Sequence, residues 1–465
     1  MKNTTCKRFY LETFGCQMNV VDSEWIATLI GDLGYQQIDA PQDADLIILN
    51  TCSVREKAER KVYGHLGSFK PLKDKNPALI LAVGGCVAQQ EKERLLERVP
   101  YLDIVFGTHN VHQLGHMVRS VEASRQRRCE TAFNHSAARF DTFPQRSGAS
   151  AVNKFVTIVQ GCDNYCTYCI VPYVRGREVS RGSAEILAEI ESLVQQGVRE
   201  ITLLGQNVNS YGQGNATGNT NANPNSNPTG SFTELLHAVH AIDGLERIRF
   251  FSSHPKDFSL ELMECFRTLP KVCPQMHLAL QSGSNRILQA MNRGYTREDF
   301  LANIDQLRSS CPQIRFSTDV IVGFPGETRE DFLDTVALLD EVGFGDVFTF
   351  LYSPRPETKA AQYDDPISKE EKHRWFEELL ARQRQISVRV WGGDVGTTQE
   401  VLVEGKSRHG SGQLFGRNLW NRIVNFNGPE KLIGRMVQVQ ITRSMNNSHL
   451  GELAATNVLI PQIHI

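Results

Sequence analysis

Residues 1–124 repeat one pattern three times: a short apolar run, a turn that holds a cysteine, and an amphipathic stretch. The apolar runs cover residues 8–13, 45–50 and 78–83, and the amphipathic stretches cover 22–33, 54–62 and 89–98. An apolar run followed by a helical stretch is typical of a strand and its crossover helix. The repetition therefore predicts an N-terminal α/β domain built on a parallel sheet.

Cys16, Cys52 and Cys86 occupy equivalent places in the three repeats, each just past a predicted strand. Because the carboxyl ends of parallel strands meet at one edge of a sheet, we expect these thiols to converge. A single buried cysteine usually serves packing, and packing or redox cysteines remain the alternative. Three cysteines at equivalent positions favour a metal centre with three thiolate ligands.

The residues that follow carry weaker signals. His109, His112 and His116 have helical spacing and predict a polar helix face more strongly than a zinc site. Residues 125–150 contain no long apolar run and predict a linker, in which Cys129 has no assigned role.

Strand and helix patterns alternate again through residues 151–381. The six predicted strands cover residues 155–159, 199–204, 247–252, 275–280, 314–322 and 347–352. Six strands are too few for a full eightfold barrel. Residues 211–231 are rich in Gly, Asn, Thr and Pro without an apolar pattern, and they predict a flexible surface insertion, with a binding loop as the alternative.

Short alternating strands separated by glycines predict a small antiparallel β-barrel at residues 383–451. From residue 381 to 450 there are ten Lys or Arg against four Asp or Glu, with Phe415, Trp420 and Phe426 among them. A local basic excess with interleaved aromatic residues indicates RNA binding, and a β module without a ligand is the alternative.

Composition restricts the function classes. The 465 residues are 40 % hydrophobic and 22 % charged, and the net charge of −2 confines any nucleic-acid binding to local patches. The eleven cysteines are odd in number and clustered, and no signal peptide precedes them, which indicates metal binding in a reducing cytoplasm. No apolar run reaches 18 residues, so we expect no membrane span. We also expect the protein to be a monomer.

The densest candidate chemistry is the C-x3-C-x2-C spacing of Cys162, Cys166 and Cys169, on a loop that follows an apolar run. A structural zinc site normally needs four protein ligands, and no fourth Cys or His lies nearby in the sequence. A [4Fe–4S] cluster is also usually held by four thiolates, so three leave one iron open to bind something else. Structural or zinc-binding cysteines remain the alternative.

This loop resembles that of the radical S-adenosylmethionine enzymes, in which the open iron binds the amino and carboxylate groups of the cofactor. The resemblance implies an open, six-stranded (β/α)6 partial TIM barrel for residues 151–381. Chemistry in such barrels lies at the carboxyl ends of the strands, where this chain has polar residues.

Gln206 and Asn207 fall where the superfamily has a Gly-Gly-Glu turn that holds the cofactor's amino group, although this sequence lacks that glutamate. Gln281, Ser282 and Asp319 are placed to meet the cofactor's ribose or methionine end, and Asp319 is also the candidate catalytic acid or base. Turn or strand-end hydrogen bonds are the alternative role for each of these residues.

Residues 50–59 and 165–173 extend the resemblance to the radical S-adenosylmethionine methylthiotransferases, and the C-terminal barrel resembles the TRAM domain of RNA-modifying enzymes. The resemblance implies a [4Fe–4S] cluster on each three-cysteine set. S-Adenosylmethionine would serve both as methyl donor and as the source of a 5′-deoxyadenosyl radical.

The branch that these residues most resemble adds a methylthio group to C2 of N6-dimethylallyladenosine at position 37 of tRNA. An electron donor and a sulfur source are further implied partners. The alternatives are methylthiolation of threonylcarbamoyl-adenosine 37 or of an aspartate in ribosomal protein S12, and a non-catalytic iron–sulfur protein that binds RNA.

Overall fold

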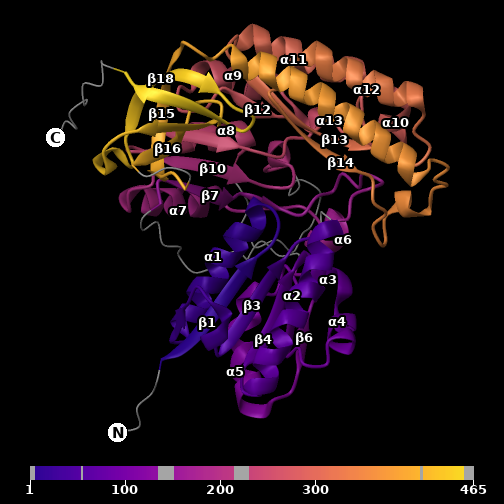
Figure 1. Cartoon of the computed structure of the whole chain (residues 1–465), viewed down its shortest axis with the longest axis vertical. Coiled ribbons are helices and arrows are strands. Elements are labelled where there is room, and N and C mark those ends of the chain that lie inside the picture. Colours follow the sequence, from indigo (N-terminus) through magenta and orange to yellow (C-terminus); the bar gives the residue numbers. More distant parts are fainter. Residues whose placement is uncertain (1–5, 54–55, 135–150, 214–229, 409–411, 455–465) are drawn as a thin grey trace.

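The computed structural model describes residues 6–53, 56–134, 151–213, 230–408 and 412–454. Figure 1 shows an N-terminal α/β domain below a larger central domain, with a small β-barrel beside the central domain. No helix in these described ranges is long and apolar enough to cross a membrane.

The N-terminal domain is a six-stranded parallel sheet in the order β2-β1-β3-β4-β5-β6. Its central strands β3 (Leu46–Thr51) and β4 (Ile80–Gly85) are buried at every residue, which explains their unbroken apolar sequence. The remaining strands are β1 (Lys7–Thr13), β2 (Tyr35–Gln37), β5 (Ile104–Phe106) and β6 (Arg128–Glu130).

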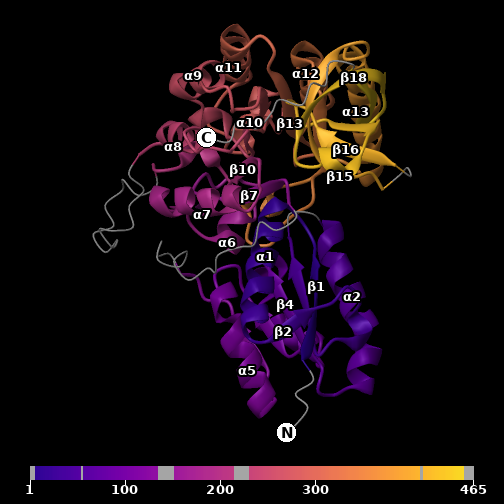
Figure 2. The ribbon, with the colours of Figure 1, turned by 90° about the vertical axis from the view of Figure 1, so that its left-hand side faces the viewer.

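Helices cover both faces of this sheet, because successive residues of a strand point to opposite sides. Leu46 and Ile48 pack with α1 (Gln17–Asp32) and α5 (Leu114–Ser124), whereas Ile47 and Leu49 pack on the other face. That second face is covered by α2 (Glu56–Lys75), α3 (Cys86–Glu91) and α4 (Glu93–Arg98), and Figure 2 shows α5 and α2 on opposite sides of the sheet.

Two predicted boundaries in this part of the chain differ from the structure. The sheet gains β6 from the first residues of the predicted linker, and Cys129 lies in that strand. Helix α1 starts at Gln17, within the predicted turn, because the Cys16 carbonyl already accepts hydrogen bonds from Asn19 and Val20. Residues 135–150 of the predicted linker lie outside the described ranges.

The central domain contains two three-stranded parallel sheets. They are β7 (Asn153–Thr157), β10 (Glu200–Leu204) and β11 (Arg247–Phe250), then β12 (Gln275–His277), β13 (Arg315–Val322) and β14 (Asp346–Leu351). A parallel bridge between Ser253 and Leu278 joins the two sheets, so the six strands follow one another in chain order. The expected open six-stranded partial barrel is confirmed.

The barrel's outer surface packs against its helices in one large core. These helices are α7 (Ser183–Gln195), α8 (Phe232–His240), α9 (Leu260–Thr268), α10 (Asn285–Ala290), α11 (Arg297–Ser310), α12 (Arg329–Val342) and α13 (Lys369–Gly392). The sequence Thr-Arg-Glu-Asp starts both α11 and α12, where Thr296 with Asp299 and Thr328 with Asp331 form capping boxes.

Part of the predicted surface insertion belongs to the core. Tyr211 is 1 % exposed, and its hydroxyl donates a 2.8 Å hydrogen bond to the carbonyl of Arg181. Residues 214–229 of the insertion lie outside the described ranges.

The C-terminal domain is a closed five-stranded barrel, β15-β16-β17-β19-β18. The strands are β15 (Thr398–Lys406), β16 (Gln413–Arg417), β17 (Ile423–Asn427), β18 (Met436–Ser444) and β19 (Ser448–Leu453). The predicted barrel is confirmed, with one difference: its pairing is not antiparallel throughout, because β19 pairs in parallel with β17.

Buried arginines fasten this barrel to the central domain. Arg247 donates to the carbonyl of Arg417 at 2.7 Å, and Arg249 donates to the carbonyls of Leu419 and Asn418 at 2.8 and 2.7 Å. Both guanidinium groups are 1 % exposed and lie beside the carboxylate of Glu200. These hydrogen bonds therefore hold the C-terminal barrel in a defined position against strand β11.

Candidate functional site

The three N-terminal cysteines come together at the carboxyl edge of the sheet, as the repeats predict. Cys16 is the N-cap of α1, Cys52 follows β3, and Cys86 is the first residue of α3 after β4. Cys52 and Cys86 are 2 % and 4 % exposed, and Cys16 is partly exposed. We call these three residues the N-terminal cysteine set.

Glycines permit this convergence. Gly15 has φ +125°, and a Cβ added there would lie 2.3 Å from Cβ and 3.0 Å from Sγ of Cys52. Gly85 has φ +88°, and a Cβ on it would lie 2.3 Å from the carbonyl oxygen of Thr51. Because L residues with a Cβ rarely adopt such φ values, both loops depend on glycine.

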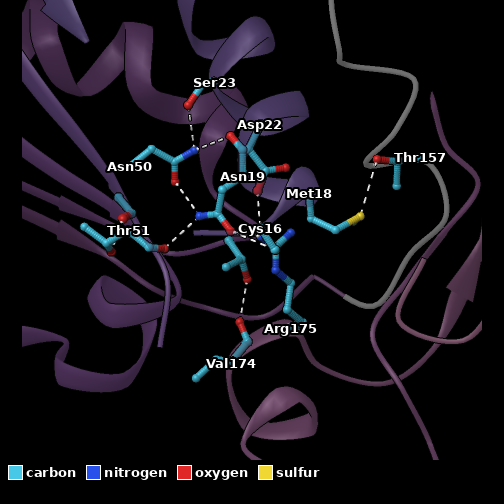
Figure 3. A network of polar contacts seen from close by, with 12 residues as sticks. Cys16, Met18, Asn19, Asp22, Ser23, Asn50, Thr51, Thr157, Val174 and Arg175 are labelled. Atoms are coloured by element: carbon cyan, nitrogen blue, oxygen red, sulfur yellow. Dashed lines mark hydrogen bonds and ion pairs between the residues drawn. The ribbon is translucent and has the colours of Figure 1, made fainter. Parts of the chain in front are cut away.

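Two buried asparagines fix the start of α1 to the end of β3 (Figure 3). Asn50 donates through Nδ2 to the carbonyl of Asn19 at 2.9 Å and to the hydroxyl of Ser23 at 2.9 Å. Asn19 donates through Nδ2 to the carbonyl of Thr51 at 2.8 Å. These bonds hold Cys16 and Cys52 in a defined relative position.

The second set of cysteines lies in the central domain, on a loop whose ends are pinned by a short hairpin. Strand β8 (Val159–Gln160) pairs with β9 (Val179–Ser180), and Gly161 after β8 has φ +87°. The loop is also anchored by the end of α10, where the hydroxyl of Thr167 donates to the carbonyl of Ala290 at 2.9 Å. We call Cys162, Cys166 and Cys169 the loop cysteine set.

Arg293 is a buried cation beside the loop cysteine set. It is 4 % exposed, and its Nη1 lies 3.3 Å from Sγ of Cys166. The other terminal nitrogen donates to the carbonyl of Ala279. A guanidinium in this place offsets negative charge that develops on the thiols.

The thiols respond differently to burial. Burial raises the pKa of Cys162 to about 12. The pKa of Cys169 is also raised to about 12, by burial and by the neighbouring sulfurs of Cys166 and Cys162. Burial also raises the pKa of Cys86, whereas a hydrogen bond from Cys52 lowers that of Cys16 to about 6. Three crowded thiols cannot all ionise without a compensating cation, and coordination to iron supplies one.

The cysteine sets in the described part of the chain are not arranged to hold a single metal ion. Within the described ranges, no three His, Cys, Asp or Glu side chains could hold one metal ion. Thiolates bound to the corners of an iron–sulfur cube stand further apart than ligands of one ion, so both sets remain compatible with [4Fe–4S] centres.

His109, which the spacing placed on a polar helix face, is 3 % exposed, and its Nε2 lies 2.8 Å from the carbonyl oxygen of Arg175.

Gln206 lies beside the loop cysteine set, and both Gln206 and Asn207 take part in protein hydrogen bonds. The Oε1 atom of Gln206 accepts from the backbone N–H of Gly161 at 2.6 Å. Asn207 is 1 % exposed and donates to Asp257 at 2.6 Å, while its Oδ1 accepts from the N–H of His254 at 3.2 Å. These hydrogen bonds fit the alternative role in a turn, and a role in cofactor binding stays a prediction.

Gln281 and Ser282 lie together where the chain leaves the strand region after β12. Gln281 has φ +74°, and its N–H donates to the carbonyl of Asp319 at 2.8 Å. Ser282 is fully buried, and its hydroxyl accepts from the N–H of Ser284 at 3.2 Å.

Asp319 lies on the inner face of the barrel, since its neighbours Thr318 and Val320 face the other way. Its carboxylate is 3.3 Å from Nε2 of His277, and its side chain is 29 % exposed. Phe251 and Phe348 each make an edge-to-face contact with that imidazole, with ring centroids at 6.4 and 5.9 Å. Phe348 is 50 % exposed, so the barrel interior presents an accessible surface of aromatic and polar groups.

The two cysteine sets are linked by α6 (Val171–Arg175), which starts two residues after Cys169. Ile170 and Val174 pack against Cys86 of the other set. Arg175 extends from the end of α6 to Asp22 on α1, with Nη2 2.8 Å from Oδ2. Figure 3 shows its side chain pointing into the group formed by Cys16, Asn19 and Asp22.

The sequence carries almost no local signal for a role of Arg175 or Arg293. For the helix that carries Arg175 the local signal is Pro172, because proline is favoured in a first helical turn. Arg293 had no signal, since its partner Cys166 lies 127 residues away in the chain.

Models of three sequence families match the chain. The Uncharacterized protein family UPF0004 matches residues 8–107, the Radical SAM superfamily matches 156–339, and the TRAM domain matches 394–454. These ranges correspond to the sheet with the N-terminal cysteine set, the barrel with the loop cysteine set, and the C-terminal barrel.

Curated relatives are similar over nearly their full length. The tRNA-2-methylthio-N(6)-dimethylallyladenosine synthase of Syntrophotalea carbinolica is 56 % identical over 446 residues, which cover 96 % of this chain and 99 % of the relative. The synthase of the same name from Geobacter sulfurreducens is 53 % identical over 450 residues, covering 97 % and 98 %.

Among solved structures, a radical S-adenosylmethionine methyltransferase from Kitasatospora setae, with cobalamin and a [4Fe-4S] cluster bound, aligns with a TM-score of 0.55. It is 14 % identical, and the alignment covers 76 % of this chain and 77 % of that one. At this identity the likeness shows a shared fold.

Proposed function

The chain belongs to the family of tRNA-2-methylthio-N(6)-dimethylallyladenosine synthases, and from that premise we propose how its parts divide the reaction. It is a radical S-adenosylmethionine methylthiotransferase that acts on N6-dimethylallyladenosine in tRNA. We place the methylthio group at C2 of the base at position 37. The observation that carries the proposal is the presence of two separate three-cysteine sets joined by α6.

The proposed ligands of a first [4Fe–4S] cluster are Cys162, Cys166 and Cys169. When bound, that cluster and S-adenosylmethionine supply the 5′-deoxyadenosyl radical that the unreactive C2–H of adenine requires. The protein's part is to keep one iron free by offering three thiolates, to neutralise charge through Arg293, and to keep the loop rigid through Gly161 and Thr167.

The proposed ligands of a second [4Fe–4S] cluster are Cys16, Cys52 and Cys86. Support comes from their convergence on one sheet edge and from the two asparagines that hold it rigid. When bound to this set, the second cluster would hold the sulfur that is transferred, and S-adenosylmethionine would supply the methyl group. Separate centres keep the radical source apart from the sulfur donor until the substrate lies between them.

Residues around the barrel's carboxyl edge are proposed to bind the cofactor. Gln206 and Asn207 would shape the turn that receives its amino group, and Gln281 and Ser282 would meet its ribose or methionine end. Asp319, paired with His277 on the inner face, is the proposed acid or base. The half-exposed ring of Phe348 offers a stacking surface for an unstacked adenine.

The C-terminal barrel is proposed to anchor tRNA through exposed basic side chains on its strands and loops. The exposed Lys and Arg residues there are Lys406, Arg408, Lys431, Arg435 and Arg443. Removal of the whole barrel would not test this cleanly. A cut after Ala381 would divide α13 and would leave Arg247 and Arg249 without their carbonyl partners.

An electron donor and a sulfur source complete the proposed reaction. We further propose that the enzyme works as a monomer in the cytoplasm, where its tRNA substrate is located.

The test of the proposed function is nucleoside mass analysis of tRNA from a strain that lacks this protein. N6-Dimethylallyladenosine should accumulate in place of its 2-methylthio derivative, and wild-type protein expressed from a plasmid should restore the derivative. A variant with Cys162, Cys166 and Cys169 replaced by alanine should not restore it. An unchanged nucleoside profile in the deletion strain would contradict the proposal.

A further inference from the structure

Arg175 is a buried cation that connects the two cysteine sets. Its side chain is 3 % exposed, and Nη2 donates to Oδ2 of Asp22 at 2.8 Å and to Oδ1 of Asn19 at 3.4 Å. Its backbone is also held by the N-terminal domain, because the carbonyl preceding it, that of Val174, accepts from the hydroxyl of Thr108 at 2.7 Å. The guanidinium therefore has little freedom to move.

One donor atom of Arg175 lacks a hydrogen-bond acceptor. Among the described residues, Nη1 of Arg175 is buried without a hydrogen-bond partner. A buried charged donor without an acceptor is costly, so such an atom usually marks a place for a missing partner. Burial opposes the charge of the guanidinium, but Asp22 and the thiols of Cys86 and Cys16 raise the pKa of Arg175, and the Cys86 thiol also forms a hydrogen bond with its side chain.

The charges around the N-terminal cysteine set also indicate a role for Arg175. Asp22 is 5 % exposed and neutralises one positive charge. A cluster bound by three thiolates adds negative charge at the same place, and Arg175 is the buried cation that faces it. Arg293 has the corresponding place in the other set, where its Nη1 already contacts Cys166.

We propose that Arg175 is a positioning residue of the N-terminal cysteine set: its free Nη1–H donates a hydrogen bond to a sulfur held there, and its charge stabilises the reduced state of the centre. The inference rests on the proposed function, since it assumes a cluster on Cys16, Cys52 and Cys86. It adds a residue of the radical domain to the site that holds the transferred sulfur.

The test uses full-length protein in which Cys162, Cys166 and Cys169 are alanine, so that only the N-terminal cluster is present. Arg175→Gln and Arg175→Lys are compared with this parent by redox titration and by iron loss to a chelator. Arg181→Gln is the matched control, because Arg181 is also buried but binds the Thr157 carbonyl and Glu189.

Arg175→Gln should lower the midpoint potential of the cluster and weaken iron retention about 10–100-fold, the usual effect of losing a group that orients a metal's ligands. Arg175→Lys should keep most of the potential but lose part of the iron retention, because it keeps the charge and lacks the fork of donors. Arg181→Gln should leave both quantities as in the parent.

A second variant keeps the inference testable if Arg175→Gln folds poorly. Asp22→Asn combined with Arg175→Gln removes the carboxylate that the single variant leaves unpaired. Because it removes one charge of each sign, its potential should lie between those of Arg175→Gln and the parent, and its iron retention should still be weakened. Parent-like potential and iron retention in the single and double variants would overturn the inference. A parent that binds no iron at all would instead overturn the proposed second cluster, and this inference with it.

Discussion

Gly15 is the position where one added methyl group should damage the N-terminal cysteine set. In Gly15→Ala the new Cβ would lie 2.3 Å from the Cys52 Cβ, at a φ of +125° that residues with a Cβ rarely adopt. Backbone strain of this kind costs about 1–3 kcal/mol. Relief of the overlap costs about 1–3 kcal/mol more, because Cys52 is buried and cannot move without its neighbours.

Gly34 provides a matched control in the same domain. It has φ +88°, but a Cβ added there would meet nothing within 4 Å. Gly34→Ala should therefore carry the backbone strain without the overlap, and it should leave the cysteines in place. The difference between the two variants isolates the contact with Cys52.

The assay is iron content after anaerobic reconstitution, together with the midpoint of urea unfolding. Gly15→Ala should lose about half of the iron of the wild type, because one of two four-iron clusters fails to assemble. It should still cleave S-adenosylmethionine, since the loop cysteine set is untouched. Gly34→Ala should keep full iron content with a small loss of stability. Equal, full iron content in both variants would refute the account of how Gly15 positions Cys52.

Three further outcomes follow from the structure. Glu200→Ala should destabilise the fold by about 3–5 kcal/mol in urea unfolding, because it strands the buried guanidinium of Arg249, 3.1 Å away; a loss below 1 kcal/mol would show that this pair is unimportant. Burial raises the pKa of Glu327 to about 7, so the folded protein keeps a proton that the unfolded chain loses above about pH 4.5. Wild-type stability should therefore fall by about 3 kcal/mol between pH 4.5 and 7, whereas Glu327→Gln should lack this component, and parallel stability profiles would contradict it. Arg435→Gln and Arg443→Gln should each reduce the slope of log affinity for tRNA against log salt by about 0.7–0.9, and an unchanged slope would place the phosphate contacts elsewhere.

Periodicity predicted most of the fold because the central strands carry long apolar runs. Strands β3 and β4 are buried throughout, and their composition alone identifies them. The missed strands β2, β5 and β6 have three residues each, too few to produce a pattern. Strand β19 contains His449 and Glu452, and its partner choice depends on closure of the barrel rather than on its own sequence.

The site was predictable only where spacing carried the signal. The two cysteine sets could be found from the repeats and from the C-x3-C-x2-C motif, and their role as cluster ligands stays a prediction. Arg175 lies 153 residues from Asp22, and Arg293 lies 127 residues from Cys166. Such pairings arise from domain docking, which no local pattern records.

The division of labour between the two cysteine sets is the central claim, and one variant tests it directly. Cys16, Cys52 and Cys86 are replaced together by alanine, and the reconstituted protein is incubated with S-adenosylmethionine, a reductant and tRNA that carries N6-dimethylallyladenosine. The account predicts that 5′-deoxyadenosine forms while no 2-methylthio product appears. Formation of the methylthio product, or loss of 5′-deoxyadenosine while the cluster on Cys162, Cys166 and Cys169 remains intact, would contradict it.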